Sequence, residues 1–255
     1  MGIRVGARSR DEIDANTLAR LNSGEEESAT LSESLAVDFS ILLAKVAPTL
    51  SPEDMRRIAD AGNLGIPKRM NIVAAILEAQ MDEEKVECLM QHRSDTVRGW
   101  AAFIIGRDRS LSLSCKLQAV QPLADDAHFG VREWAWLALR PAISAELCKS
   151  LKELESWASS PSDKIRRFAI EATRPRGVWS KHIAELTKSP GLAQALLDRV
   201  MADSSKYVQD SCGNWLNDAG KSEPQWVVDY CHSWKKRNSS AATNYIVRRA
   251  LRNIA

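Results

Sequence analysis

A short motif recurs along this chain and limits the folds that are open to it. Each copy begins with a polar turn and a β-branched residue. The next residue is an arginine in most copies, and a small residue follows three positions after it. The copies are SDTVRGWA from Ser94, HFGVREWA from His128, SDKIRRFA from Ser162, SKYVQDSC from Ser205 and, in looser form, NYIVRRAL from Asn244. Their β-branched residues, which are 34, 34, 43 and 39 residues apart, are Val97, Val131, Ile165, Val208 and Val247. This period is typical of a helix pair with its turns.

Repetition of this kind predicts an all-α fold. Gly occurs only 12 times and Pro 9 times in 255 residues, and apolar residues recur at three- and four-residue spacing, which is the pattern of amphipathic helices. One helix pair cannot bury its apolar face alone, so stacked neighbours must supply the missing core. We therefore predict a HEAT-like helical-repeat solenoid, an α-α superhelix with a concave surface.

The repeats also suggest domain limits and structural roles. The polar run SGEEESAT precedes the first durable apolar pattern, so residues 1–30 are expected to form a flexible or loosely docked N-terminal segment and residues 31–255 the repeat domain. The repeated arginines are open to a purely structural interpretation, a ladder of stacking and capping contacts. In most repeats an Asp or Ser ahead of the helix is expected to cap its start.

Charge is distributed unevenly along the chain. Residues 161–255 hold 16 Lys and Arg against 9 Asp and Glu, a net charge of +7, whereas residues 1–160 hold 19 against 24, a net charge of −5. A basic half beside an acidic half suggests a polyanionic partner for the basic half. We therefore expect the concave surface of the C-terminal half to face DNA, the alternative being unequal surface charge without a partner.

Composition disfavours several classes of protein. The five cysteines are widely spread with no C-x-x-C pair, and the four histidines are scattered, so neither a disulfide framework nor a structural metal is expected. No stretch approaches the roughly 18 apolar residues that span a bilayer. We expect a cytoplasmic protein with no cofactor and no membrane association.

One turn concentrates side chains that are suited to chemistry. In the run FAIEATRPRGVW, Pro175 should stop the helix and Gly177 should loosen the turn that follows. Arg174, Arg176 and Trp179 on such a turn are poorly placed for a core. They are well placed to meet phosphates and a sugar or base.

Three acidic residues accompany this turn. Glu171 lies one helical turn before the break, on the same side as Lys164 and Arg167, so an Arg167–Glu171 helix pair is the structural alternative to a functional role. Asp218 is expected near the C-terminal end of its helix, where the helix dipole disfavours a carboxylate.

Asp218 has a structural alternative as well. Asn214 precedes it by four residues and could form a hydrogen bond with it. The third carboxylate, Glu133, occupies an equivalent place in an earlier repeat. Three carboxylates and a tryptophan from successive repeats are therefore expected to converge on one surface.

Three runs of sequence carry a resemblance to a known family. They are RRFAIEATRPRGVW, YVQDSCGNWLND and PQWVVDY. They resemble the HEAT-like DNA alkylation repair glycosylases, and most of all the AlkC branch of the AlkC/AlkD superfamily, whose pattern includes similar E-x-T-R-P-R and N-x-L-N-D elements. The resemblance implies that Asp218 is the catalytic carboxylate, that Glu171 and Glu133 are accessory active-site carboxylates, and that Trp179 contacts the lesion nucleotide.

The resemblance also implies an activity. It is hydrolysis of the N-glycosidic bond of a cationic alkylated purine, such as 3-methyladenine, by a monofunctional, monomeric enzyme of base excision repair. An ionised Asp218 would stabilise the developing oxocarbenium ion and assist the attacking water. The partner would be double-stranded DNA with alkylated bases. The candidates for contacts with it are Arg174, Arg176, Lys164, Arg167, Lys206 and Arg248.

Two other functions fit the same sequence. A non-catalytic HEAT-repeat scaffold that binds DNA or a protein accounts equally well for the repeats and the charge asymmetry. It does not require Glu171, Trp179 and Asp218 to meet, so their geometry discriminates between the two. A DNA-structure binder that has lost excision activity would keep the carboxylates and bind without releasing a base.

Overall fold

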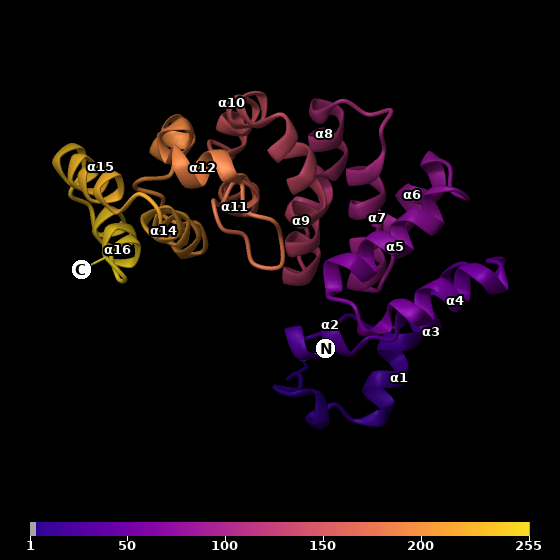
Figure 1. The fold of residues 1–255 in the computed structure, drawn as a ribbon. Helices are drawn as coiled ribbons and strands as arrows, with labels where there is room; N and C mark the ends of the chain where they lie inside the picture. The colour runs from indigo at the N-terminus through magenta and orange to yellow at the C-terminus, as the bar shows by residue number, and fades with distance from the viewer. Residues whose placement is uncertain (1–3, 255) are drawn as a thin grey trace. The chain divides into compact units, whose positions relative to one another are not determined.

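A computed structural model describes residues 4–254, and every regular element in that range is a helix (Figure 1). The α-helices before residue 125 are α1 (Ala15–Ser23), α2 (Leu31–Ala36), α3 (Phe39–Val46), α4 (Pro52–Asp60), α5 (Ile66–Glu78), α6 (Glu83–Met90), α7 (Asp95–Arg107) and α8 (Leu113–Ala124). The later ones are α9 (Phe129–Ala145), α10 (Leu147–Trp157), α11 (Asp163–Ala172), α12 (Ala184–Lys188), α13 (Gln194–Asp198), α14 (Lys206–Gly220), α15 (Pro224–Arg237) and α16 (Ala241–Ala250). Short 3-10 helices lie at Arg10–Glu12, Ala61–Asn63 and Pro190–Ala193. The all-α prediction is confirmed.

The chain forms two compact units, which are described separately. The first unit consists of Met1–Ser110 and Asp126–Ala138, and the second of Leu111–Asp125 and Leu139–Ala255. Helix α9 begins in the first unit and ends in the second. Residues 4–30 belong to the first unit, and the division expected after residue 30 stays a prediction.

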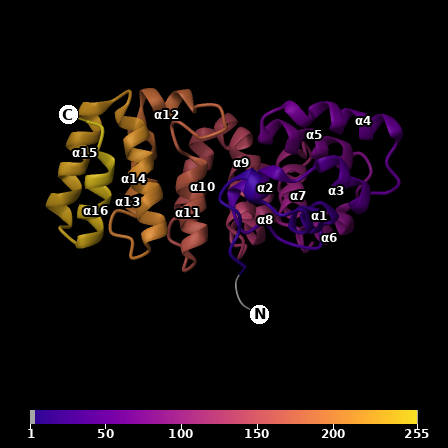
Figure 2. The same ribbon diagram turned by 90° about the horizontal axis from the view of Figure 1, so that it is seen from below.

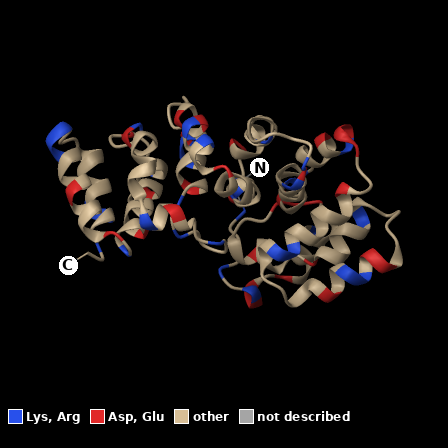
Figure 3. Cartoon of the chain, turned by 45° about the horizontal axis from the view of Figure 1, so that its top comes forward, with Lys and Arg blue, Asp and Glu red and all other residues tan. Residues whose placement is uncertain are grey.

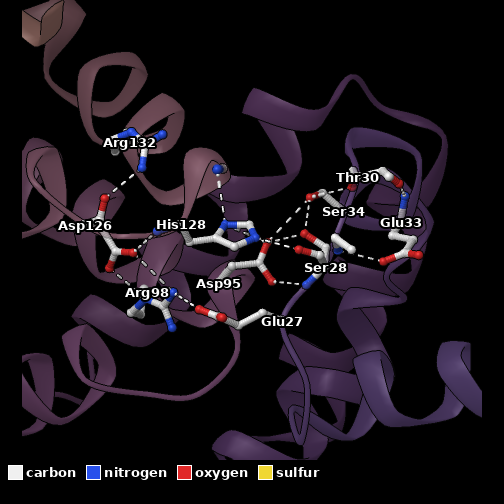
Figure 4. Close-up of polar contacts among 12 residues, drawn as sticks. Glu27, Ser28, Thr30, Glu33, Ser34, Asp95, Arg98, Asp126, His128 and Arg132 are labelled. Atoms are coloured by element: carbon white, nitrogen blue, oxygen red, sulfur yellow. Dashed lines mark hydrogen bonds and ion pairs between the residues drawn. The ribbon is translucent and has the colours of Figure 1, made fainter. Parts of the chain in front are cut away.

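Specific hydrogen bonds hold the N-terminal residues in the first unit (Figure 4). The backbone N–H of Ser28 donates to Asp95 at 3.0 Å and its hydroxyl donates to the same carboxylate at 2.8 Å. His128 Nε2 lies 2.6 Å from the Ser28 carbonyl oxygen, and His128 Nδ1 accepts from the Gly130 N–H at 3.1 Å. Because Nδ1 is an acceptor, Nε2 carries the proton and donates to Ser28. Residues near position 28 are thus tied to the start of α7 and to the turn before α9.

Buried Glu33 is a second anchor of the N-terminal residues. Its carboxylate accepts from both Nη atoms of Arg4 at 2.8 and 2.6 Å and from the backbone N–H groups of Ala7 and Ala29 at 2.8 and 2.7 Å. A carboxylate with this many donors stays ionised, and its pKa is lowered even though burial opposes the shift. The segment from Arg4 onward is therefore fixed by contacts that the sequence did not reveal.

The recurring arginines have a structural role in the first three repeats. Arg98, Arg132 and Arg166 donate to the two carbonyl oxygens five and six residues earlier, at 2.7 to 3.0 Å. Gln209 does the same to the Asp203 carbonyl oxygen at 2.7 Å. Each side chain closes the turn that leads into its own helix, so the capping interpretation is confirmed for the three arginines.

The expected serine caps are wrong for three repeat helices, whereas Ser240 caps α16 by accepting from the Thr243 N–H at 3.2 Å. Ser94, Ser162 and Ser205 occupy the N-cap positions of α7, α11 and α14, but none of their hydroxyls caps the helix. Ser162 Oγ instead donates to Asp125 at 2.6 Å, and Ser205 Oγ donates to Asp163 at 2.6 Å. In the second unit these hydroxyls link one repeat to the previous one.

Packing in the second unit places successive repeat helices side by side. Helix α11 packs against α14, and α14 packs against α16, while α10, α12 and α15 lie in a second layer (Figures 1 and 2). The small residues Ala169 and Cys212 are completely buried, as are Trp215 and Trp234. The close contact of α11 and α14 brings the end of one helix beside the end of the next, and this is where the candidate site lies.

Candidate functional site

Two carboxylates from successive repeats meet at one guanidinium in the second unit. Arg174 Nε and Nη2 donate to Asp218 Oδ2 at 2.9 and 2.6 Å, and Arg174 Nη1 donates to Glu171 Oε2 at 3.1 Å. All three side chains are largely buried. The sequence-based expectation that Glu171 and Asp218 lie together is met by this geometry, with Arg174 between them.

Helix ends explain this arrangement. Helix α11 stops at Ala172, so Arg174 is the second residue outside it and its side chain turns back toward Glu171. The Thr173 hydroxyl donates to the Ala169 carbonyl oxygen at 2.9 Å, and Trp215 Nε1 donates to the Thr173 carbonyl oxygen at 3.0 Å. The indole of Trp215 thereby fixes the end of α11 against α14.

The remaining oxygens of the two carboxylates also have partners. Lys221 Nζ lies 3.0 Å from Asp218 Oδ1, just beyond the end of α14. Ser211 Oγ donates to Glu171 Oε1 at 2.7 Å, and Arg167 Nη2 lies 3.6 Å from the same oxygen. The Arg167–Glu171 helix pair therefore exists alongside the contact with Arg174.

The two carboxylates determine the ionisation of Arg174. Burial alone would lower the pKa of this guanidinium, but the negative charges of Glu171 and Asp218 outweigh it and the net shift is upward. Arg174 is thus held in its charged form by the acids that it joins. The arrangement fixes the orientation of both carboxylates, as a positioned acid pair requires.

Arg140, a residue of α9, holds the turn that follows α11. It is 2% exposed and donates to the carbonyl oxygens of Ala172, Arg174 and Lys181. Burial and, to a lesser extent, the nearby charge of Arg174 lower the pKa of Arg140 to about 10. A buried guanidinium that donates to three carbonyls is a strong constraint on the backbone of residues 172–181.

The tip of the turn carries exposed apolar side chains. Trp179 is 46% exposed and Val178 is 55% exposed. Trp179 has a φ of 60°, in the left-handed region, which costs a non-glycine residue on the order of 1–2 kcal/mol. A Cβ atom on Gly177 would lie 3.0 Å from the Arg140 guanidinium carbon and 2.0 Å from Ser180 Oγ. Glycine is therefore required there for the turn to approach Arg140 this closely.

Comparison with known proteins identifies the family. The family model described as DNA alkylation repair enzyme matches residues 67–254. The chain belongs to the DNA alkylation repair enzyme family. The resemblance found in the T-R-P-R and N-x-L-N-D runs is thereby confirmed at the level of the family.

The individual proteins that this chain resembles are distant in sequence. The alkylpurine DNA glycosylase AlkC of Pseudomonas fluorescens, solved bound to DNA containing an abasic site analog, has a TM-score of 0.67 and 23% identity, over 98% of this chain and 65% of its own. AlkD2 from Streptococcus mutans has a TM-score of 0.61 and 22% identity, over 79% and 99% respectively. The uncharacterized protein YhaZ of Bacillus subtilis is 25% identical over 204 residues, 79% of this chain and 56% of its own length. The two structures establish the shared fold, and this chain spans only about half to two thirds of AlkC and YhaZ.

The cations expected to contact DNA have varied surroundings in this chain. Arg174 is engaged with the two carboxylates, and its expected phosphate contact stays a prediction. Arg176 Nη2 donates to Ser222 Oγ at 2.7 Å, and Lys164 Nζ donates to the Asp125 carbonyl oxygen at 3.0 Å. In the view of Figure 3, the helices of the second unit carry both basic and acidic residues.

Two of the cations expected to contact DNA lie over the same aromatic ring. Lys206 and Arg248 are exposed, and both cationic groups lie over the ring of Tyr245. Lys206 also lies 3.6 Å from Asp210, whose carboxylate accepts from the Tyr245 hydroxyl at 2.6 Å. Tyr245 therefore organises two exposed cations on neighbouring helices, α14 and α16.

Glu133 belongs to the first unit, where its carboxylate accepts from Trp136 Nε1 at 2.8 Å. Its convergence with Glu171 and Asp218 stays a prediction. Within residues 4–254, no group of three or more His, Cys, Asp or Glu side chains is arranged to hold a metal ion. No helix of that described range is long and apolar enough to cross a membrane.

Sequence reasoning missed two residues of the site. Arg140 is the only charged residue of the run WAWLALRPA, and a charge in an otherwise apolar helix was a signal of a buried partner. Lys221 lies three residues after Asp218, the last residue of the N-x-L-N-D run. This spacing was a signal for an ion pair at the helix end.

Proposed function

We propose that this protein is a monofunctional DNA glycosylase that hydrolyses the N-glycosidic bond of cationic alkylated purines such as 3-methyladenine in double-stranded DNA, as a step of base excision repair. The observation that carries the proposal is the pairing of Glu171 and Asp218, from successive repeats, on Arg174. Membership of the DNA alkylation repair family and the fold shared with AlkC support it.

The chemistry needs negative charge more than it needs acid. An alkylated purine with a positive charge is already a good leaving group, and it departs with the bonding electron pair and becomes neutral. Positive charge then develops on the sugar, where a nearby carboxylate stabilises it. The oxygen of a water molecule bonds to C1′, and its proton passes to Asp218 as general base.

Each site residue has a role in this scheme. Asp218 is the catalytic carboxylate, with Glu171 and Glu133 as accessory carboxylates that add field or orient the water. Arg174 is a positioning residue, because it fixes Glu171 and Asp218 by hydrogen bonds of 2.6 to 3.1 Å. The exposed indole of Trp179 favours a cationic nucleotide through its π face.

The DNA partner is proposed to lie against the second unit. The exposed cations Lys206 and Arg248 are suited to backbone phosphates, which position a duplex without reading its sequence. Lys164, Arg167 and Arg176 are proposed to add to the positive field there. We propose that the enzyme acts as a monomer in the cytoplasm and without a cofactor.

The direct test is base release from alkylated DNA. Purified protein is incubated with duplexes containing N3- and N7-methylpurines, and the released bases are identified by chromatography. In Asp218→Asn the uncharged amide cannot stabilise the oxocarbenium ion, so release of 3-methyladenine should fall by about 100-fold or more. Duplex binding should stay nearly unchanged.

The matched control is Asp229→Asn, an exposed position on α15. This variant should release bases like the wild type, and both variants should be assayed below their unfolding midpoints. Undiminished release by Asp218→Asn would remove Asp218 from the mechanism. Duplex binding by the wild type without release of any base would support a DNA-structure binder, and absence of DNA binding would support a scaffold for a protein partner.

A further inference from the structure

The two oxygens of Asp218 are held by cations of different character. Oδ2 accepts twice from Arg174, whose side chain is 14% exposed, whereas Oδ1 faces Lys221, whose side chain is 49% exposed. Asp218 itself is only 6% exposed. One side of the carboxylate is therefore closed by a buried residue, and the other by a residue at the surface.

Arg174 is fixed in place. Its guanidinium also binds Glu171 at 3.1 Å, and its backbone carbonyl oxygen accepts from Arg140. Moving it away from Asp218 would break both hydrogen bonds of a largely buried ion pair, which is strongly unfavourable.

Lys221 is free to move by comparison. It is the C-cap residue of α14, and its ammonium is carried on a flexible four-carbon stem. Ion pairs of exposed lysines contribute little to stability. The backbone beside it is anchored, because the N–H groups of Ser222 and Glu223 donate to the Ala219 carbonyl oxygen at 3.0 and 2.9 Å. Movement is thus restricted to the lysine side chain.

We propose that Lys221 is a displaceable cover, and that its ammonium occupies the place on Asp218 which the positive charge of an alkylated nucleotide takes. The inference rests on the function proposed above. A cationic nucleotide exchanges one positive charge for another, so the largely buried carboxylate stays paired throughout. A neutral nucleotide has no charge to exchange, and it leaves Lys221 on Asp218.

The experiment measures binding to two duplexes that differ only in charge at the lesion. One carries a pyrrolidine abasic nucleotide, which is positively charged, and the other carries a tetrahydrofuran abasic nucleotide, which is neutral. In Lys221→Met the cationic duplex no longer competes with the ammonium. The ratio of its affinity to that of the neutral duplex should rise by about two- to fivefold over the wild type, the size expected of an exposed ion pair.

Two further variants distinguish displacement of the Lys221 ammonium from a general effect of removing a positive charge. Lys188→Met removes an exposed lysine at the end of α12 in the same unit and should leave the ratio unchanged. Lys221→Arg keeps a cation at the position and should retain the ratio of the wild type. Circular dichroism and thermal unfolding check that all three variants are folded.

The outcomes distinguish failure of the Lys221 cover from failure of the proposed glycosylase function. If the wild type releases alkylated bases but Lys221→Met leaves the ratio unchanged or lowers it, the cover is overturned and the glycosylase remains. The cover is also overturned if Lys221→Arg behaves like Lys221→Met. If the wild type binds neither duplex and releases no base, the proposed function fails and the cover fails with it.

Discussion

At the residue scale, the guanidinium of Arg174 links Glu171 and Asp218, which come from different repeats. The positions of Glu171 and Asp218 near their helix ends follow from helical spacing and a proline, so they were predictable. Their meeting on Arg174 was not, because it depends on how α11 and α14 pack and on how the chain turns after Ala172. The same dependence explains why Arg174 was expected to contact phosphate. Sequence spacing predicts the face of a helix on which a residue lies, but not how far that residue is from the next helix.

Trp179 provides a test at this scale because its backbone and its indole make opposite contributions. Its φ of 60° is unfavourable for any residue with a Cβ. Trp179→Gly should therefore be more stable than Trp179→Ala by about 1 kcal/mol, although glycine normally destabilises a folded chain. Denaturant unfolding measures the difference, and equal stability of the two variants would show that the left-handed backbone is not retained.

Both Trp179 variants should also lose affinity for lesion DNA, because each lacks the indole face. A cation on an aromatic face contributes about 0.5–2 kcal/mol, so the cationic abasic duplex should bind several-fold more weakly. Trp157, which packs against Phe168 with ring centroids 4.9 Å apart, is a tryptophan with a packing role. Trp157→Phe is therefore the control, and it should leave DNA affinity unchanged.

At the scale of elements, the turn between α11 and α12 is held by a residue from a different helix. The T-R-P-R run predicted the turn itself, and the repeated motif predicted the helices that flank it. Arg140 comes from α9, and its bonds to Ala172, Arg174 and Lys181 span 32 to 41 residues of sequence. A contact of this range has no local signal beyond the unusual placement of one charge.

Arg140→Met should loosen this turn while α14 stays folded. Three carbonyl oxygens lose their donor, and each buried group without a partner costs about 1–3 kcal/mol. Amide hydrogen exchange should accelerate at Ile183, whose N–H donates to the Pro175 carbonyl oxygen at 3.0 Å. Exchange at buried Trp215 in α14 should change less.

Arg199→Met is the control for this prediction, because Arg199 is a mostly exposed arginine of the same unit that pairs with Glu155 at 3.6 Å. Its exchange pattern should match that of the wild type. Uniform acceleration across the second unit in Arg140→Met would mean that Arg140 stabilises the whole unit and not the turn.

At the scale of the whole molecule, the uneven charge is the property that sequence alone described best. The net charge of +7 over residues 161–255 and of −5 over residues 1–160 follows from counting. Counting does not show which cations are available to a partner, since Arg166 is paired with Asp203 and Arg237 with Asp198. The cations available to a polyanion are a subset that only packing selects.

Salt dependence distinguishes that subset. Each phosphate contact steepens the fall of log affinity with log salt by about 0.9 for duplex DNA. Lys206→Gln and Arg248→Gln, which remove the two exposed cations over Tyr245, should each reduce the slope by about 1 and weaken binding to lesion and undamaged duplexes equally. Lys68→Gln, at an exposed lysine of α5 in the acidic half, should leave the slope unchanged. Because the three substitutions remove the same charge, equal effects from all of them would place DNA binding in the overall field of the chain, and a selective effect would place it on the α14 and α16 surface.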